Sequence, residues 1–96
     1  MAKYRAYVTI MGELGDESLD FLDLCMELET EDFWEAKRFY DALVVKPDGV
    51  LANTLHANHP EYVRIEADYD IEMVGDDEYM DWYYIETIWA KEDYYG

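Results

Sequence analysis

Residues 63–74, "VRIEADYDIEMV", alternate apolar and polar side chains along their whole length. Successive side chains of a β-strand point to opposite faces of a sheet, so this period of two predicts a strand with one apolar face and one polar face. Each polar residue after Arg64 is a carboxylate. The polar face is therefore a line of negative charge, made of Glu66, Asp68, Asp70 and Glu72.

A second alternating run, residues 79–90, follows after the polar segment "GDDE". Two alternating runs around a short polar turn predict an antiparallel hairpin. If Asp76 and Asp77 form the turn, the pairs on the acidic face are Glu72 with Asp81, Asp70 with Tyr83, Asp68 with Ile85, Glu66 with Thr87, and Arg64 with Trp89. The opposite face then supplies the core residues Val63, Ile65, Ala67, Tyr69, Ile71, Met73, Met80, Trp82, Tyr84, Ile88 and Ala90.

The N-terminal part of the chain holds a further strand and an ambiguous segment. Residues 3–11 alternate and are rich in β-branched and aromatic side chains, which predicts a strand. In residues 18–29, "SLDFLDLCMELE", the aspartates and a glutamate gather in one arc of a helical wheel, no β-branched residue occurs, and Ser18 can cap a helix. These features favour a helix, but residues 22–29 also alternate as a strand does. A second strand paired with the first is the competing prediction.

The clearest helix lies in residues 30–46, "TEDFWEAKRFYDALVVK", with Thr30 as a plausible N-cap. Trp34 falls on the polar side of this helix. A shorter helix is expected near residues 50–57, capped by Asp48. The core stripe of the first helix should contain Phe33, Ala36, Tyr40, Leu43 and Val44.

These elements predict a single α+β domain over residues 1–96. A chain of this length can bury one core without disulfides or a structural metal. We expect an antiparallel sheet of three strands that includes the long C-terminal hairpin, with the helices packed on one face. If residues 18–29 are a strand, the sheet has four strands.

The charge of the chain is strongly one-sided. Asp and Glu number 24 against 7 Lys and Arg, which gives a formal net charge of −17. Hydrophobic residues make up 51% of the chain, so it can bury enough apolar area to fold, which a disordered acidic tail cannot. The charge repels nucleic acids and anionic membranes, since both are bound through clustered Lys and Arg. A basic protein surface is attracted instead, and the predicted partner is therefore a basic protein.

Carboxylates at alternate strand positions lie about 6.6 Å apart, and such a rigid line of charge is comparable to the phosphates of one nucleic-acid strand. Tyr and Trp side chains between them would supply stacking surfaces for arginine. In size and charge pattern the chain resembles the small acidic inhibitors of phages and mobile elements, which include DNA-mimic antirestriction proteins and anti-CRISPR proteins. The resemblance implies blockade, without catalysis, of the basic nucleic-acid-binding surface of a CRISPR effector, a restriction enzyme or a nuclease.

Two alternatives to this hypothesis stay open. Acidic immunity or antitoxin proteins that neutralise a nuclease toxin also place aromatic residues among carboxylates, and a non-inhibitory structural homodimer would bury the same aromatic residues. The carboxylates of residues 17–35 could also replace the hairpin as the binding face. The predicted partner-binding residues are Glu66, Asp68, Asp70, Glu72, Asp76, Asp77, Glu78 and Asp81, with Tyr79, Tyr83 and Trp89 as anchors.

No catalytic or metal-binding constellation is recognisable in the sequence. His56 and His59 form a pair without a Cys or a spaced carboxylate, which is weak evidence for a metal site. A calcium-loop pattern fails, because Met73 stands where Gly is required and Tyr79 where Glu is required. The single cysteine, Cys25, is compatible with a reducing cytoplasm. We therefore expect a cytoplasmic binding protein without a cofactor or metal, and not an enzyme.

Overall fold

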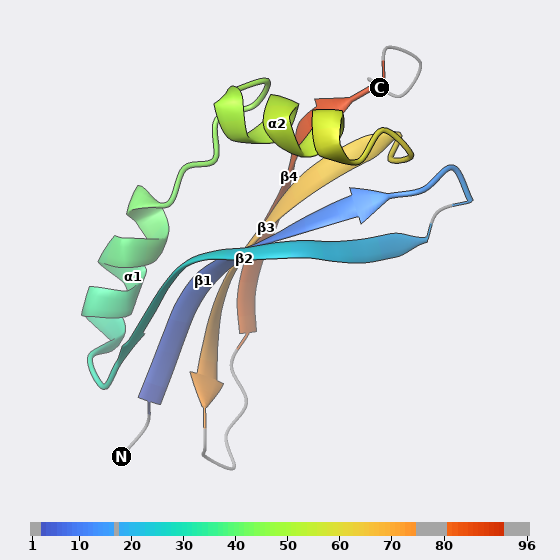
Figure 1. Ribbon diagram of the computed structural model, residues 1–96. Helices are drawn as coiled ribbons and strands as arrows, with labels where there is room; N and C mark the ends of the chain where they lie inside the picture. The colour runs from blue at the N-terminus through green and yellow to red at the C-terminus, as the bar shows by residue number, and fades with distance from the viewer. Residues whose placement is uncertain (1–2, 17, 75–80, 92–96) are drawn as a thin grey trace.

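The structure is a computed structural model that describes residues 3–16, 18–74 and 81–91. Within these residues the elements are β1 (Lys3–Glu13), β2 (Leu19–Thr30), α1 (Phe33–Ala42), α2 (Val50–Asn58), β3 (Arg64–Val74) and β4 (Asp81–Ala90). The strands form one antiparallel sheet with the order β2-β1-β3-β4. Figure 1 shows a strongly twisted sheet with both helices on the same side. The predicted α+β class, the antiparallel sheet and the one-sided helices are confirmed.

The core lies between the sheet and the two helices. Val8 and Ile10 of β1 are fully buried, and so are the alternate residues of 65–71 on β3, all on the face that the alternation predicted. Ala36 of α1 and Ala52 of α2 have no exposed surface. Their small side chains let both helices approach the sheet closely. The opposite face of the sheet is left without a helix on it (Figure 1).

Residues 19–30 form a strand, so the favoured helix over residues 18–29 is wrong and the competing four-stranded prediction describes this segment. The register of β2 with β1 skips two residues, Leu22 and Met26, at two β-bulges. Each extra residue shifts the alternation of side chains by one position. Because the two bulges lie one helical turn apart in the sequence, the shifted strand pattern resembles helical periodicity. Met26 adopts a positive φ of 49°, a left-handed conformation that a bulge accommodates.

The register of β3 with β4 follows the predicted acidic-face pairs from Glu72 to Glu66 and then departs from them. A bulge follows, and beyond it Arg64 pairs with Ala90. The predicted pair of Arg64 with Trp89 is therefore wrong. Trp89 lies on the helix side, where its ring stacks on His56 of α2 with the ring centroids 3.6 Å apart.

The helix α1 is shorter than predicted at both ends. Asp32, not Thr30, is its N-cap, and the Asp32 carboxylate accepts a hydrogen bond from the backbone N–H of Trp34 at 2.9 Å. Because the helix ends at residue 42, the chain beyond it is extended and its side chains alternate. Val44 is 71% exposed whereas Val45 is 4% exposed, so the prediction that Val44 belongs to the core is wrong.

The predicted short helix is present as α2. Its N-cap is Gly49, and Asp48 has a positive φ of 55° and does not cap the helix through its side chain. The side-chain amide of Asn53 donates to the backbone oxygens of Asp48 and Gly49, each at 2.9 Å. The side chain of Asn53 therefore holds the loop segment that precedes α2 in place.

A close contact between Gly12 of β1 and the ring of Tyr62 joins the sheet to the segment before β3. A Cβ atom at Gly12 would lie 2.7 Å from three carbons of that ring. The ring cannot easily move away, since Tyr62 is 6% exposed and its hydroxyl donates to Asp20 Oδ2 at 3.0 Å. Glycine is required here for space.

We predict that Gly12→Ala lowers the free energy of unfolding by about 2 kcal/mol, because the added methyl group overpacks this contact. Urea denaturation followed by circular dichroism measures the change. Gly15→Ala is the matched control, since no atom lies within 4 Å of the added Cβ, and its effect should stay within about 0.5 kcal/mol. Equal midpoints for the two variants would show that Tyr62 can move aside.

Candidate functional site

The face of the sheet opposite the helices is named the open face here. Directly paired residues of neighbouring strands point to the same side of a sheet, so the registers place its members. They are Lys3, Arg5, Tyr7, Thr9, Met11 and Glu13 of β1, Arg64, Glu66, Asp68, Asp70 and Glu72 of β3, Leu19, Phe21, Glu27 and Glu29 of β2, and Tyr83, Ile85 and Thr87 of β4. Acidic residues far outnumber the two arginines on this face.

Arg5 lies near one end of the open face, between carboxylates of both neighbouring strands. Its guanidinium donates to Glu27 Oε2 at 2.9 Å and to Glu72 Oε1 at 3.3 Å. The same group lies over the ring of Tyr7, 4.3 Å from the ring centroid. The hydrogen bond to Glu27 is the largest cause that raises the pKa of Arg5 above its ordinary value. Arg5 thus connects three strands and offsets part of their charge.

Arg64 has the same role near the opposite end of the open face. Its guanidinium forms an ion pair with Glu13 of β1 and another with Glu66 of its own strand, the latter at 2.7 Å. Glu66 is only 7% exposed. A buried carboxylate that an arginine holds in this way is part of the internal structure, because separating the pair would leave an uncompensated charge.

The predicted line of four carboxylates is therefore bound by arginine at both of its ends. Glu66 and Glu72, at its ends, are each bound to an arginine. Asp68 and Asp70 lie between them, half-buried, and in register with two large side chains of β4. Asp68 and Asp70 are named the central pair.

Tyr7 lies beside the central pair on the neighbouring strand. Its hydroxyl donates to Glu72 Oε2 at 3.3 Å. The pKa of Tyr7 is raised far above its ordinary value, first because the phenol is buried and then because the charges of Asp70 and Glu72 oppose a tyrosinate. The phenol therefore stays a neutral donor among the carboxylates.

Large apolar side chains are exposed along the two edge strands of the open face. Phe21 of β2 is 62% exposed, and Leu19 is 52% exposed. On β4, Tyr83 is 63% and Ile85 is 49% exposed. Exposed aromatic and aliphatic groups are typical contact residues of protein-binding surfaces. The predicted anchor Tyr83 is one of them, whereas the predicted anchor Trp89 lies on the other side of the sheet.

Part of the predicted site lies outside the described residues, namely Asp76, Asp77, Glu78 and Tyr79. Asp81 pairs with Glu72 in the ladder between β3 and β4. The contributions of Arg5 on β1 and Phe21 on β2 were missed in the sequence prediction, whereas Glu27 belongs to the carboxylates of residues 17–35 that it gave as an alternative binding face. The alternation of residues 22–29 was the available signal for the β2 side chains.

The two histidines have other contacts. His56 stacks on Trp89, and His59 Nδ1 lies 3.5 Å from Glu61 Oε1. Over residues 3–16, 18–74 and 81–91, no three His, Cys, Asp or Glu side chains come together as ligands for a metal ion. In the same part of the chain, neither helix has the length and apolar composition that a membrane crossing requires.

Comparison of the chain with protein-family models, with curated proteins and with solved structures found no match.

We predict that Arg5→Gln lowers the free energy of unfolding by about 1 kcal/mol, because two carboxylates lose their shared cation. Urea denaturation at low salt measures the loss, which should shrink in about 0.5 M NaCl as repulsion is screened. The control Lys3→Gln removes the same charge from a more exposed ion pair with Glu29. Equal losses for both variants would mean that only the net charge matters.

Alkaline titration should separate the tyrosines into two groups. Burial is the first cause that raises the pKa of Tyr7, Tyr40 and Tyr69, so the folded state holds these protons more tightly than the unfolded state. The free energy of unfolding should therefore be unaffected by these groups below about pH 10 and should fall as the pH rises above that value. Ultraviolet absorbance of tyrosinate and urea denaturation at each pH measure both effects. Tyr7→Phe should reduce the slope, and an unchanged slope would contradict the assignment.

Proposed function

We propose that the chain is an acidic inhibitor that binds a basic protein through its open face and so keeps nucleic acid away from that protein. The observation that carries this proposal is the open face itself. It is a sheet face without a helix on it, its acidic residues outnumber its arginines, and its edge strands expose large apolar groups. The resemblance in size and charge pattern to phage-encoded DNA mimics and anti-CRISPR proteins supports the same function.

The electrostatics support a protein partner over a nucleic acid. The formal net charge of −17 attracts a basic surface over several ångströms and speeds its encounter with the chain. The same charge repels phosphates. Because Arg5 and Arg64 are occupied by carboxylates of the same chain, neither is available to bind a phosphate without breaking an ion pair.

The exposed apolar residues of the edge strands supply the close contacts that slow dissociation, which long-range charge does not provide. Charged groups at the rim of an interface act mainly on the rate of association, whereas buried aromatic and aliphatic contacts slow dissociation. Phe21, Tyr83 and Ile85 are exposed enough to make such contacts on both sides of Asp68 and Asp70. Asp76, Asp77, Glu78, Tyr79 and Asp81 remain proposed contacts on the basis of the sequence.

The identity of the binding partner distinguishes the two alternative functions from the proposed one. An immunity or antitoxin protein would use the same surface on a nuclease toxin, so it differs from an anti-defence inhibitor only in what it binds. A structural homodimer would bury the apolar edges against a second copy. Self-association of this kind should increase with salt, because salt screens the repulsion between two acidic chains.

We predict that the double variant Asp68→Asn, Asp70→Asn loses at least about tenfold in affinity for the partner, since it removes the central charges of the open face. Immobilised wild-type protein and the variant are exposed to bacterial lysate and eluted with increasing salt. A bound protein is then purified and tested for displacement of labelled nucleic acid by the wild-type chain.

The matched control is Glu31→Gln, Glu35→Gln, which removes two exposed charges at the start of α1. This control should bind as the wild type does. Equal binding by both double variants would contradict the open face as the site. A partner that still binds nucleic acid when saturated with the chain would contradict the inhibitory function.

A further inference from the structure

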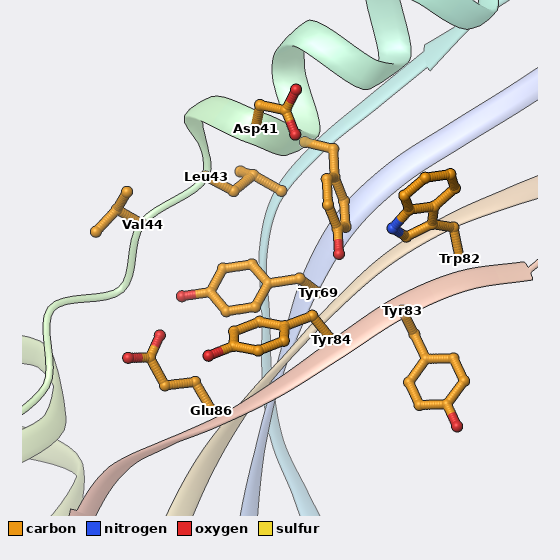
Figure 2. A pocket seen from close by; sticks show the side chains of 9 residues that line it. Asp41, Leu43, Val44, Tyr69, Trp82, Tyr83, Tyr84 and Glu86 are labelled. Atoms are coloured by element: carbon orange, nitrogen blue, oxygen red, sulfur yellow. The ribbon is translucent and has the colours of Figure 1, made fainter.

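A pocket of about 410 Å³ lies on the helix side of the sheet, between the end of α1 and the strands β3 and β4. Its volume is within the range of small-ligand sites, about 300–1,000 Å³. Figure 2 shows the rings of Tyr69 and Tyr84 side by side, with Trp82 farther along β4. The carboxylates of Asp41 and Glu86 also line the pocket, from α1 and from β4. The pocket is therefore aromatic and acidic.

The aromatic groups are held in place by contacts within the protein. Tyr69 is 5% exposed, and its hydroxyl accepts a hydrogen bond from the backbone N–H of Val45 at 2.9 Å. The ring of Tyr84 stacks on that of Tyr69, with the centroids 6.0 Å apart. Tyr84 remains 55% exposed and Trp82 49% exposed. Their ring faces are positioned and still accessible.

The pocket exists because the helices cover the sheet unevenly. α1 packs on β1, β2 and β3, whereas α2 packs on β4, where His56 stacks on Trp89. Trp82 and Tyr84 of β4 face the helix side, but neither helix covers them, and both are about half exposed. Both were predicted as core residues, and their exposure corrects that prediction.

The protein places one of its own cations against the aromatic wall. The ammonium of Lys37 lies 5.3 Å from the ring centroid of Trp82 and 5.7 Å from that of Tyr40. Asp41 accepts hydrogen bonds from this ammonium at 2.7 and 2.9 Å. Aromatic faces attract cations through the negative charge of their π-systems. The position of Lys37 thus indicates that the aromatic wall of the pocket binds positively charged groups.

A second carboxylate, Glu86, lines the pocket from β4. Among the described residues no ion pair with Lys, Arg or His is formed by Glu86, so it can receive a cation from outside. Burial raises the pKa of Tyr69, and the charge of Glu86 raises it further. The negative potential of Glu86 therefore extends to the aromatic floor of the pocket.

We propose that this pocket binds the guanidinium group of an arginine residue in another protein chain. A guanidinium stacks on aromatic faces and pairs with a carboxylate through two parallel N–H donors, as Tyr84 and Glu86 would require. The apolar stem of arginine would pack on Leu43 and Val44 at the same pocket. A quaternary ammonium has no donor for Glu86. Tyr83 of the open face also lines the pocket. The inference does not rest on the proposed function, because the aromatic floor and the two carboxylates of the pocket lie on the helix side of the sheet.

The test is a titration of the protein with N-acetyl-arginine amide at constant ionic strength, followed by the indole N–H resonances in NMR spectra. The resonance of Trp82 should shift and saturate. The exposed Trp34 of α1 serves as an internal control and should not shift. N-acetyl-citrulline amide, the neutral isostere, should leave Trp82 unchanged. Glu86→Gln should weaken binding about fivefold, whereas Glu61→Gln, which changes an exposed carboxylate outside the pocket, should bind as the wild type does.

Four results would overturn the proposal. Equal shifts with the arginine and citrulline amides would show that the positive charge is not recognised. Parallel shifts of Trp34 and Trp82, or unchanged affinity in Glu86→Gln, would show unspecific attraction to an acidic chain. Binding of methylguanidinium as tight as that of the blocked arginine would assign the pocket to a small guanidinium compound instead of a protein side chain.

Discussion

The uninterrupted ladder between β1 and β3 is the constraint on which both surfaces of the protein depend. Each residue of β1 from Lys3 to Glu13 has a partner on β3, and the register contains no shift. Alternate residues of these two strands therefore keep their side of the sheet over the full length of the pair. The helices pack on one side, and the two arginines meet their carboxylates on the other. Bulges are confined to the pairings with the edge strands β2 and β4.

The two arginines let the sheet tolerate a high density of negative charge without cancelling it. Arg5 and Arg64 each bind one carboxylate of β3 and one from another strand. Arg5 lies between carboxylates of β2 and β3, and Arg64 between carboxylates of β1 and β3, so these short-range pairs offset part of the repulsion within the sheet. The rest of the acidic residues outnumber the few cations and act at longer range, within about 10 Å in physiological salt. Structural stability and long-range attraction thus depend on different carboxylates of the same face.

The parts of the fold that follow a simple period were predictable, and those that depend on a break in the period were not. The alternation of β1, β3 and β4 predicted the strands, the hairpin pairs up to Glu66 and the core side of β3, but it wrongly placed Trp82 and Tyr84 of β4 in the core. A single bulge in β4 moved Trp89 to the helix side, and two bulges in β2 gave residues 18–29 the appearance of a helix. The pairing of Arg5 with Glu72 joins residues 67 positions apart, and no local pattern signals such a contact. The pocket depends on where α1 ends relative to β4, which the sequence pattern does not determine.

The bulge at Met26 has a consequence for changes in chain length. On either side of it, Glu27 pairs with Tyr7 and Cys25 with Val8, which are themselves consecutive residues of β1. Deletion of Met26 would join the two pairs into a regular ladder and leave all other side chains of β2 on their present sides. Deletion of a paired residue in the middle of β3 would instead invert every side chain beyond it. The bulge at Met26 is therefore a place where the chain can lose a residue without a change of side for its neighbours, whereas the central strands must keep their length.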